Sequence, residues 1–408
     1  MLIDPAAPLE SPGQKLDTSS LEPTTHFMFG ACLARAGFNR KTALATSVMV
    51  IAAEIPDLDI FLELRGPVYG FQHHRGATHT LLGVPFDAAA ALLIVYAARR
   101  LRQWRRGGGA RARSGPAPRW GLLYALACVA ALSHILLDFT NSYGVRPLMP
   151  FSYGWHHWDI VAIFEPFMWA VLFLGLVLPS LFSLIHEEIG ARHSGPRGRV
   201  AAVAALAAVA LMWGARDYEH RRALAALDAM EYGSELPVRV SAYGTMLNIF
   251  AWNGVVETDT AFRAMPVDSL TPEVDPRRQA RIFYKPAVTP PLTAAKASYL
   301  GRVFLDWADY PVFEMRQLMP GEDALDQLGR AAGAATLRPA ALIQEAGTAP
   351  AGYVVRMYDL RYFDVDSALR GRRRTLGGTV QLDAELHPVA YYMGSFFGRT
   401  VQRLQPPR

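Results

Sequence analysis

Histidine and acidic residues recur at or beside the ends of apolar runs in the first 165 residues of the 408-residue chain. They are His26, Asp57, Asp59, His74, His79, His134, Asp138, His156, His157, Asp159 and Glu165. Imidazole nitrogens and carboxylate oxygens are ligands that proteins offer to zinc and related divalent ions. Because these groups stand where hydrophobic stretches break off, the pattern predicts a metal site built at a membrane surface.

His134 and Asp138 form the strongest pair, because residues four apart project from the same face of a helix. One metal ion could bind the imidazole nitrogen and the carboxylate oxygen together. The alternative is a helix-end pair that caps the helix or binds only itself. The pair ends an apolar run, however, and an ionisable group inside a membrane costs about 2.5–3.5 kcal/mol on insertion scales. This cost favours metal ligation.

Two further segments add candidates before the first long apolar run. His74 and His79 belong to a segment with three histidines and an arginine, which could instead contact lipid headgroups as an interfacial basic segment. Asp57 and Asp59 follow a proline, an arrangement that suits a loop presenting a metal ligand or a general base to a water molecule. An ordinary acidic turn is the alternative for this second pair.

A later segment carries His156, His157 and Asp159 among tryptophans and is followed by Glu165. Tryptophans beside polar groups are typical of a membrane interface, so an aromatic belt is one interpretation. The density of histidines and acids favours a contribution to the metal site, with Asp159 and Glu165 as weaker candidate ligands. Arg146, between this segment and the helical pair, could clamp an anionic phosphate.

Apolar runs must position these groups. Four are candidate spans of about 30 Å of hydrocarbon, namely Thr80–Ala98, Trp120–Asp138, Ile160–Ile185 and Val200–Ala215. The segment Ala43–Ile55 has the length of a buried or re-entrant helix. A short hairpin of His26–Phe38 and Thr42–Ile55, with Asn39-Arg40-Lys41 at its turn, would return His26 and Asp57 to one face.

Arginine predicts the orientation of these runs. Residues 99–119 hold eight arginines and no acid, and three more arginines lie in the loop between the last two runs. By the positive-inside rule both loops are cytoplasmic, which places His79, Asp138, Asp159 and the domain after Ala215 on the outer face of a bacterial inner membrane. Because the basic residues lie in loops between apolar runs, we expect no nucleic-acid partner.

Composition agrees with a membrane protein. Hydrophobic residues make up 51% of the chain and charged residues 19%, below the roughly 25% of soluble domains. Both cysteines lie in apolar runs, so neither a thiolate metal site nor a disulfide framework is expected.

Three parts are expected along the chain. Residues 1–23 form a disordered tail, residues 24–215 a membrane domain with about four transmembrane helices, and residues 216–408 an extracytoplasmic α+β or mostly β domain. Alternating apolar residues predict strands at Tyr353–Tyr362 and Thr379–Leu386, with Gly377-Gly378 as a turn, while Pro320–Ala351 looks partly helical. Residues 107–118 are expected to form a flexible basic linker.

The order and spacing of these motifs over about residues 24–170 resemble one family. The motifs that carry the resemblance are Thr25-His26 with Gly30, Pro56-Asp57-Leu58-Asp59, His74-Arg75-Gly76-Ala77-Thr78-His79-Thr80, Ser133-His134-x-x-x-Asp138 and Tyr143-Gly144-Val145-Arg146. They resemble the membrane-bound metal-dependent hydrolases of the YdjM type, also described as LexA-binding, inner-membrane-associated hydrolases. That family is distantly similar to zinc-dependent phospholipases C and single-strand zinc nucleases.

The resemblance implies a hydrolase of phosphoester bonds with a phospholipase C-like helical metal site. It implies His26, Asp57, His79, His134 and Asp138 as ligands of a divalent metal, with zinc as the expected ion. Asp57 could instead be the base. His74, Asp59, Asp159 and Glu165 are weaker candidates.

The sequence therefore predicts a polytopic all-α membrane domain that holds a metal and hydrolyses a phosphoester with a metal-activated water. Asp57 or Asp59 would orient or deprotonate that water, and Arg146 would stabilise developing negative charge. The lipid bilayer is the expected partner and a phospholipid headgroup a candidate substrate. A non-catalytic metal-binding scaffold or a transporter is the rival hypothesis. Transport would place ionisable groups near mid-membrane rather than at the ends of spans, where this sequence has them.

Overall fold

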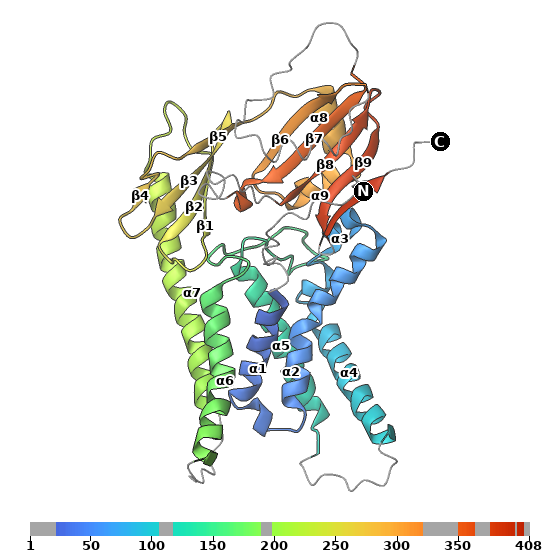
Figure 1. Cartoon of the computed structure of the whole chain (residues 1–408), viewed down its shortest axis with the longest axis vertical. Helices are drawn as coiled ribbons and strands as arrows, with labels where there is room; N and C mark the ends of the chain where they lie inside the picture. The colour runs from blue at the N-terminus through green and yellow to red at the C-terminus, as the bar shows by residue number, and fades with distance from the viewer. Residues whose placement is uncertain are drawn as a thin grey trace, which may run out of the picture.

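The computed structural model describes residues 22–105, 117–188, 198–320, 350–363, 376–395 and 398–403. A bundle of helices forms one end of the molecule, and two β-sheets form the other (Figure 1). The expected tail, basic linker and helix at Pro320–Ala351 fall wholly or largely outside the described residues.

The bundle contains one short hairpin and four longer helices. The hairpin is made of α1 (Glu22–Arg35), the turn η2 (Phe38–Arg40) and α2 (Ala45–Glu54). The longer helices are α4 (Val84–Arg105), α5 (Trp120–Thr140), α6 (Pro166–Glu188) and α7 (Arg199–Asp228). The structure thus contains the short hairpin that the sequence suggested, and it returns both ends of that hairpin toward the sheets (Figure 1).

Small residues let the bundle helices approach closely. Ala34, Ala52, Ala88 and Ala127 are fully buried within a single apolar cluster formed by α1, α2, α4 and α5. Gly30 faces α2 so closely that an added Cβ would lie 2.9 Å from the Cβ of an alanine there. Small residues at helix contacts are typical of packing inside membranes, where the hydrophobic effect does not drive association.

Two described helices, α5 and α7, are long and apolar enough to cross a membrane. A third span is added if α4 and the preceding segment Pro67–His79, bent by 89° against each other, count as one. The N-terminal region is therefore helical with two to three possible membrane spans by length and composition.

Short elements connect the bundle to the sheets. They are η3 (Pro56–Arg65), α3 (Pro67–His73) and η4 (Ala77–His79), which follow α2, and an irregular segment at residues 141–165, which follows α5. Tight helical turns and loops allow side chains from distant parts of the chain to converge at this junction.

The C-terminal region is a β-sheet domain, as the sequence predicted. The first sheet has the order β1-β2-β3-β4, with β5 also paired to β3. Its strands are β1 (Arg239–Gly244), β2 (Ala251–Glu257), β3 (Ala261–Asp268), β4 (Glu273–Val274) and β5 (Arg281–Tyr284).

The second sheet has the order β10-β9-β8-β7-β6, and every neighbouring pair is antiparallel. Its strands are β6 (Pro311–Leu318), β7 (Gly352–Asp359), β8 (Gly377–Asp383), β9 (Pro388–Ser395) and β10 (Gly398–Arg403). The helices α8 (Pro290–Ala297) and α9 (Tyr299–Trp307) pack on this sheet, and a 3-10 turn, η5 (Leu360–Tyr362), follows β7.

The expectation of a turn at Gly377-Gly378 was wrong, because both glycines begin β8. An added Cβ on Gly377 would lie 2.0 Å from the carbonyl oxygen of Met357 on β7, and one on Gly378 would lie 2.9 Å from Leu300 of α9. Glycine within a strand marks the close approach of another backbone or element, and here it admits both neighbours.

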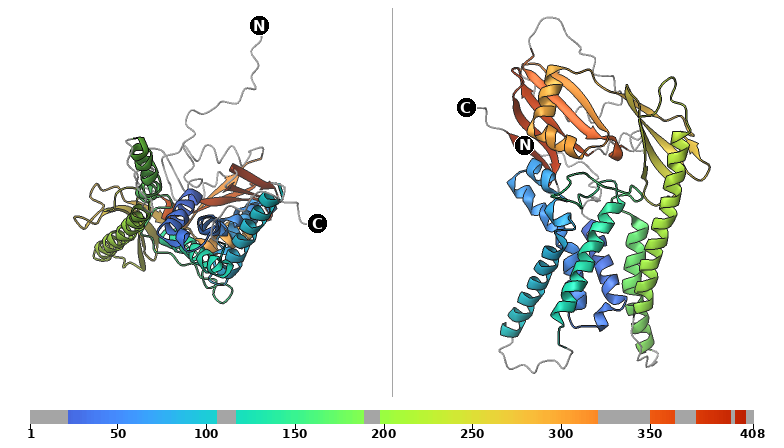
Figure 2. Two further views of the ribbon diagram at one scale, coloured as in Figure 1. Left: turned by 90° about the horizontal axis from the view of Figure 1, so that it is seen from below. Right: turned by 180° about the vertical axis from the view of Figure 1, so that it is seen from behind.

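The helix α7 links the two ends of the molecule. It continues through the expected domain boundary at Ala215 as far as Asp228, and its last turns pack against the first sheet (Figure 2). The second sheet joins the bundle differently, because Val68 of α3 and Tyr143 belong to the same apolar core as α8, α9 and the strands.

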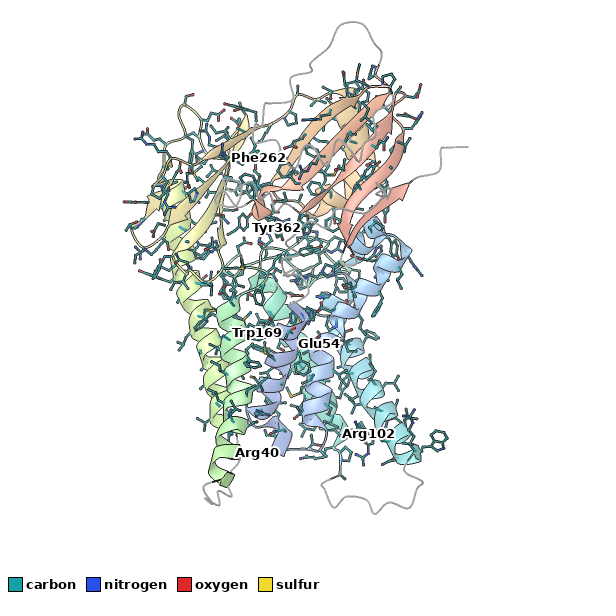
Figure 3. The ribbon with its side chains drawn as sticks, viewed as in Figure 1. Arg40, Glu54, Arg102, Trp169, Phe262 and Tyr362 are labelled. Carbon is teal, nitrogen blue, oxygen red and sulfur yellow. The ribbon has the colours of Figure 1, made fainter. Side chains whose placement is uncertain are left out.

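Exposed arginines lie at the end of the bundle far from the sheets. Figure 3 shows Arg40 and Arg102 at the end far from the sheets, whereas Glu54 lies in the half nearer to them. The histidines and acids of the predicted site belong to the elements at this nearer end.

Candidate metal centre

Four of the five principal ligands predicted from the sequence meet at one point. Asp57 comes from η3, His79 from η4, and His134 and Asp138 from successive turns of α5. Each offers one ligand atom, and these four atoms all lie within 4.8 Å of one another. The cluster, which we call the metal centre, lies at the junction between the bundle and the sheets.

The spacing of the ligand atoms suits a single tetrahedral ion. The Nε2 atoms of His79 and His134 are 3.0 Å apart and lie 3.2 Å and 3.3 Å from Oδ2 of Asp138. The same two nitrogens lie 3.6 Å and 3.4 Å from Oδ1 of Asp57. Ligands bound to zinc at about 2.0–2.1 Å stand about 3.3–3.4 Å apart in a regular tetrahedron. Five of the six distances are near this spacing, and the sixth, between the carboxylate oxygens of Asp57 and Asp138, is at most 4.8 Å, so the four residues can hold such an ion with a modest shift of a carboxylate.

Hydrogen bonds orient both imidazoles toward the centre. Nδ1 of His134 donates to the carbonyl oxygen of Ala53 at 2.6 Å, and Nδ1 of His79 lies 3.1 Å from Oγ1 of Thr78 and 3.4 Å from Oδ2 of Asp59. Neutral imidazole carries one N–H, so with its N–H on Nδ1 His134 presents the lone pair of its Nε2 atom to the centre. The two Nε2 atoms are 3.0 Å apart, a spacing that either an N–H from His79 or a shared cation accounts for. Carbonyl and carboxylate partners on the other nitrogen are typical of metal-bound histidines.

Burial divides the four ligands. The side chains of His79 and His134 are fully buried and that of Asp138 is 1% exposed, whereas that of Asp57 is 21% exposed. Asp57 is therefore the least buried of the four ligands.

His26 lies beside the metal centre and binds the other oxygen of Asp138. Its Nε2 atom is 3.3 Å from Oδ1 of Asp138, and its ring stacks on that of His134 at 3.8 Å between centroids. Arg75 reaches the same Oδ1 at 2.9 Å. Of the predicted ligands, His26 thus supports Asp138 rather than joining the four converging atoms.

Asp59 and His74 form a layer behind His79. Oδ1 of Asp59 lies 3.0 Å from Nδ1 of His74, and Oδ2 accepts the backbone N–H of Arg75 at 2.7 Å. Burial raises the pKa of the Asp59 carboxyl, but the facing imidazoles of His74 and His79 outweigh it and hold the pKa well below its usual range. Asp59 is therefore an ionised orienting group for His79.

Replacing Asp59 with asparagine should lower the affinity of the metal centre for Zn²⁺ about 10- to 100-fold, the usual effect of losing an outer carboxylate. The physical reason is that an amide orients the His79 imidazole less strongly than a carboxylate. Isothermal titration of the metal-free protein measures the change, and Glu231→Gln, at an exposed acid of the sheet domain, is the control. Equal affinities in the two variants would show that Asp59 does not support the site.

Three weaker candidates are engaged elsewhere. Arg146 donates to the carbonyl oxygen of Gln72 and pairs with Asp306 at 3.5 Å, rather than standing free to clamp a phosphate. Asp159 pairs with His157 at 2.8 Å. Glu165 forms a buried ion pair with Arg216 of α7, at 2.6 Å. The segment 141–165 folds toward the sheet domain, and it takes these side chains into contacts at the domain junction.

His157 binds the two domains together. Its Nδ1 faces Asp159 at 2.8 Å, and its Nε2 faces Asp309 of the sheet domain at 3.0 Å. Burial lowers the pKa of His157, but the hydrogen bonds to both carboxylates outweigh it and raise the pKa to about 9. The charged imidazole is thus favoured by folding.

We expect the protein to lose stability as the pH rises from 7 to 10. A histidine whose pKa is raised by folding stabilises the folded state below its unfolded pKa, and this contribution disappears as the pH passes about 9. The loss is at most about 3 kcal/mol, since each pKa unit corresponds to about 1.4 kcal/mol. Unfolding of the detergent-solubilised protein measures it. The decline should be smaller in His157→Gln, and an identical decline would assign it to other groups.

Arg75 is the residue whose importance the sequence interpretation missed. It is buried and reaches Asp138, Asn141 and the carbonyl oxygen of Gly144 with its guanidinium, while its backbone holds Asp59. Its position between His74 and Gly76, inside the motif richest in ligands, was the available signal.

Comparisons with known proteins agree with the helical half of this description. Residues 21–223 match the model of the YdjM inner membrane protein family, a range that includes every residue of the metal centre and ends within α7. Over 133 residues the chain is 28% identical to a protein of Bacillus subtilis (strain 168) described as uncharacterized protein YfhP. This match covers 31% of the chain and 35% of that relative.

The chain thus spans about a third of the length of the curated relative that it matches. No solved structure matches the chain. The family match covers the motifs from His26 to Asp138 in one continuous stretch and leaves most of the sheet domain outside it. Through its helical half, the chain belongs to the YdjM inner membrane protein family.

Proposed function

We propose that the protein is a membrane-bound, metal-dependent hydrolase that cleaves a phosphoester bond at headgroup depth. The observation that carries this proposal is the metal centre itself. Four ligand atoms stand within 4.8 Å of one another, two of them on imidazoles fixed by outer hydrogen-bond partners. Zinc is the ion that we expect, because mixed histidine and carboxylate ligands in a tetrahedral arrangement suit it.

The residues around the centre have distinct tasks in this proposal. His79, His134 and Asp138 are buried and would hold the ion, while the second oxygen of Asp138 pairs with the Arg75 guanidinium and contacts the His26 imidazole. A divalent cation in such a site supplies a nucleophilic water at neutral pH and polarises a phosphoryl oxygen.

Asp57 is the ligand that we assign a second task. Catalytic zinc sites keep three protein ligands and one open position, whereas four protein ligands close a structural site. Asp57 alone of the four is partly exposed, and it lies in a 3-10 turn rather than on a long helix. It can therefore leave the ion and accept the proton of the attacking water, with the other three ligands in place.

The second candidate is a non-catalytic metal-binding scaffold. The observation that favours it is the completeness of the tetrahedron, since Asp57 Oδ1 lies at ligand spacing from both imidazoles. In this case Asp57 stays on the ion and the site is structural.

The orientation in the membrane is also part of the proposal. The basic residues of α4 and of the turn η2 lie at the end of the bundle far from the sheets. By the positive-inside rule that end faces the cytoplasm, and the metal centre and the sheet domain face outward.

The test is to strip metal from the purified protein in detergent, restore Zn²⁺, Mn²⁺ or Mg²⁺ separately, and measure hydrolysis of bis(p-nitrophenyl) phosphate. A hydrolase should regain activity with at least one ion. Asp57→Asn should lower the rate at least a hundredfold, while the exposed His156→Ala retains it. One bound ion per chain with no hydrolysis under any condition would favour the scaffold instead.

A further inference from the structure

Large, partly exposed apolar side chains occur in the segments that hold the metal centre and in the loop after α5. They come from three segments, and the set that we call the apolar collar is Leu58, Phe61, Leu81, Phe86, Leu148 and Phe151. Their exposed fractions run from 46% to 88%. The second and third segments are joined by a hydrogen bond from the N–H of Leu81 to the carbonyl oxygen of Pro147 at 2.9 Å. Single exposed apolar residues are ordinary, whereas a group of them marks an interaction surface.

The collar adjoins ligands of the metal centre in the chain. Leu58 directly follows Asp57 in η3, and Leu81 follows His79 by two residues. Asp57 is also the least buried ligand of the four. The least buried part of the metal centre is therefore next to exposed apolar groups in the chain.

The sheet domain covers the neighbouring side. Tyr143 packs edge-on against His74 at 5.2 Å between ring centroids, and its carbonyl oxygen accepts the indole N–H of Trp307. Arg361 donates to the carbonyl oxygen of Ser142 and stacks over the Trp307 ring at 4.2 Å. These contacts bury the loop that follows Asp138 beneath the sheet domain.

The depth of the centre matches that of a lipid phosphate. The 21 residues of α5 extend about 31 Å, close to the thickness of the hydrocarbon core of a bilayer. His134 and Asp138 lie in its last two turns. Phe86 lies in the first turn of α4, whose exposed apolar residues continue along the helix at Leu93 and Ile94. The collar is thus continuous with the apolar outer surface of the bundle.

We propose that the collar lies among the lipids of the bilayer and that substrates reach the metal centre laterally, so that the substrate is the phosphoester of a membrane lipid rather than a water-soluble one. This inference rests on the proposed hydrolase function. Apolar side chains beside the open ligand admit the acyl chains, while the phosphate stands at the depth of Asp57 and Asp138. The covering sheet domain disfavours entry of bulky soluble substrates from the aqueous side.

The position of the collar can be tested without any activity. Cys32 and Cys128 are first replaced by alanine, and single cysteines are introduced for a nitroxide label as Phe61→Cys, Phe86→Cys and, in the sheet domain, Val288→Cys. Val288 is 87% exposed and is the matched control. In lipid nanodiscs, the two collar labels should collide more with oxygen than with a water-soluble nickel chelate, and the Val288 label should do the opposite. Collar labels that behave like the Val288 label would overturn the proposal.

The substrate class is tested with two probes that share a headgroup. Vesicles of phosphatidylcholine supply the lipid, and glycerophosphocholine is the soluble counterpart. We expect at least a tenfold higher rate on the vesicles. Phe61→Asp should reduce the ratio of the two rates at least tenfold, while Val288→Asp leaves the ratio unchanged.

The outcomes separate the two proposals. Equal rates on both probes would overturn lateral entry and leave the hydrolase in place. Hydrolysis of neither probe, nor of bis(p-nitrophenyl) phosphate, would reject the hydrolase and with it the lipid substrate, even if the labels place the collar in lipid.

Discussion

Replacing His134 with alanine is expected to lower the affinity for Zn²⁺ at least a hundredfold and to abolish metal-dependent hydrolysis. Loss of an outer partner of a metal ligand typically costs 10- to 100-fold in affinity, so loss of the ligand itself should exceed about a hundredfold. His134 is fully buried, and its Nε2 stands 3.0 Å from that of His79 and 3.3 Å from Asp138. Water cannot readily replace such a constrained ligand. Titration with Zn²⁺ in the presence of a competing chelator measures the affinity.

The matched control is His156→Ala. His156 lies 22 positions later, is exposed, and pairs with Val145 through its backbone, so its imidazole can be removed without disturbing that pairing. A second ligand variant, His79→Ala, guards against a local effect of one substitution. If both ligand variants bind Zn²⁺ as tightly as the control, the four side chains are not a metal site.

The second large effect is expected at Arg75. Removal of this guanidinium leaves the Asp138 carboxylate buried with a weaker partner, and breaking one side of a buried ion pair typically costs about 3–5 kcal/mol. We therefore expect Arg75→Met to reduce the stability of the metal-free protein by about this amount. Arg75 also has a positive backbone φ of 51°, a conformation rarely adopted by residues with a side chain, which its N–H to Asp59 helps to hold.

Metal should reduce the effect of this substitution. An ion bound at Oδ2 supplies positive charge to the same Asp138 carboxylate that the guanidinium contacts at Oδ1, so the difference in stability between Arg75→Met and the parent protein should shrink when Zn²⁺ is bound. Unfolding in detergent, with and without Zn²⁺, measures both values. Arg65→Met, at an exposed arginine, is the control. A destabilisation that is the same in both conditions would mean that Arg75 acts independently of the metal centre.

Spacing within one helix made part of the site predictable. His134 and Asp138 had to share a face once the apolar run around them was a helix. The joining of Asp57 and His79 to this pair depends on two 3-10 turns and a bend, which have no period in the sequence. The motif resemblance, rather than any local pattern, brought these residues together in advance.

The ion-pair partners of Arg146, Asp159 and Glu165 could not be predicted from residue type. Each is a plausible ligand or clamp by chemistry alone. Each instead forms an ion pair with a residue more than 50 positions away or within the folded segment 141–165, namely with Asp306, His157 and Arg216. Partners of this kind are set by how the loop 141–165 packs against α7 and the sheet domain, which the alternation of apolar residues does not predict.

The same limit applies to Gly377 and Gly378. Glycine pairs commonly mark turns, and local sequence contained nothing to indicate that α9 and β7 would press against this strand. The β-sheet character of the C-terminal domain was predictable from alternation, whereas the crowding at a single position was not.

The hydrogen bond from Arg361 to the carbonyl oxygen of Ser142 also has a consequence for biosynthesis. The two residues are 219 positions apart. The ribosome completes the helix that carries His134 and Asp138 long before it reaches Arg361, so the bundle can enter the membrane while the loop after it still lacks its cover. The finished surroundings of the candidate metal centre belong to the last stage of synthesis, and we expect a chain released early to carry every ligand yet to bind a metal ion more weakly.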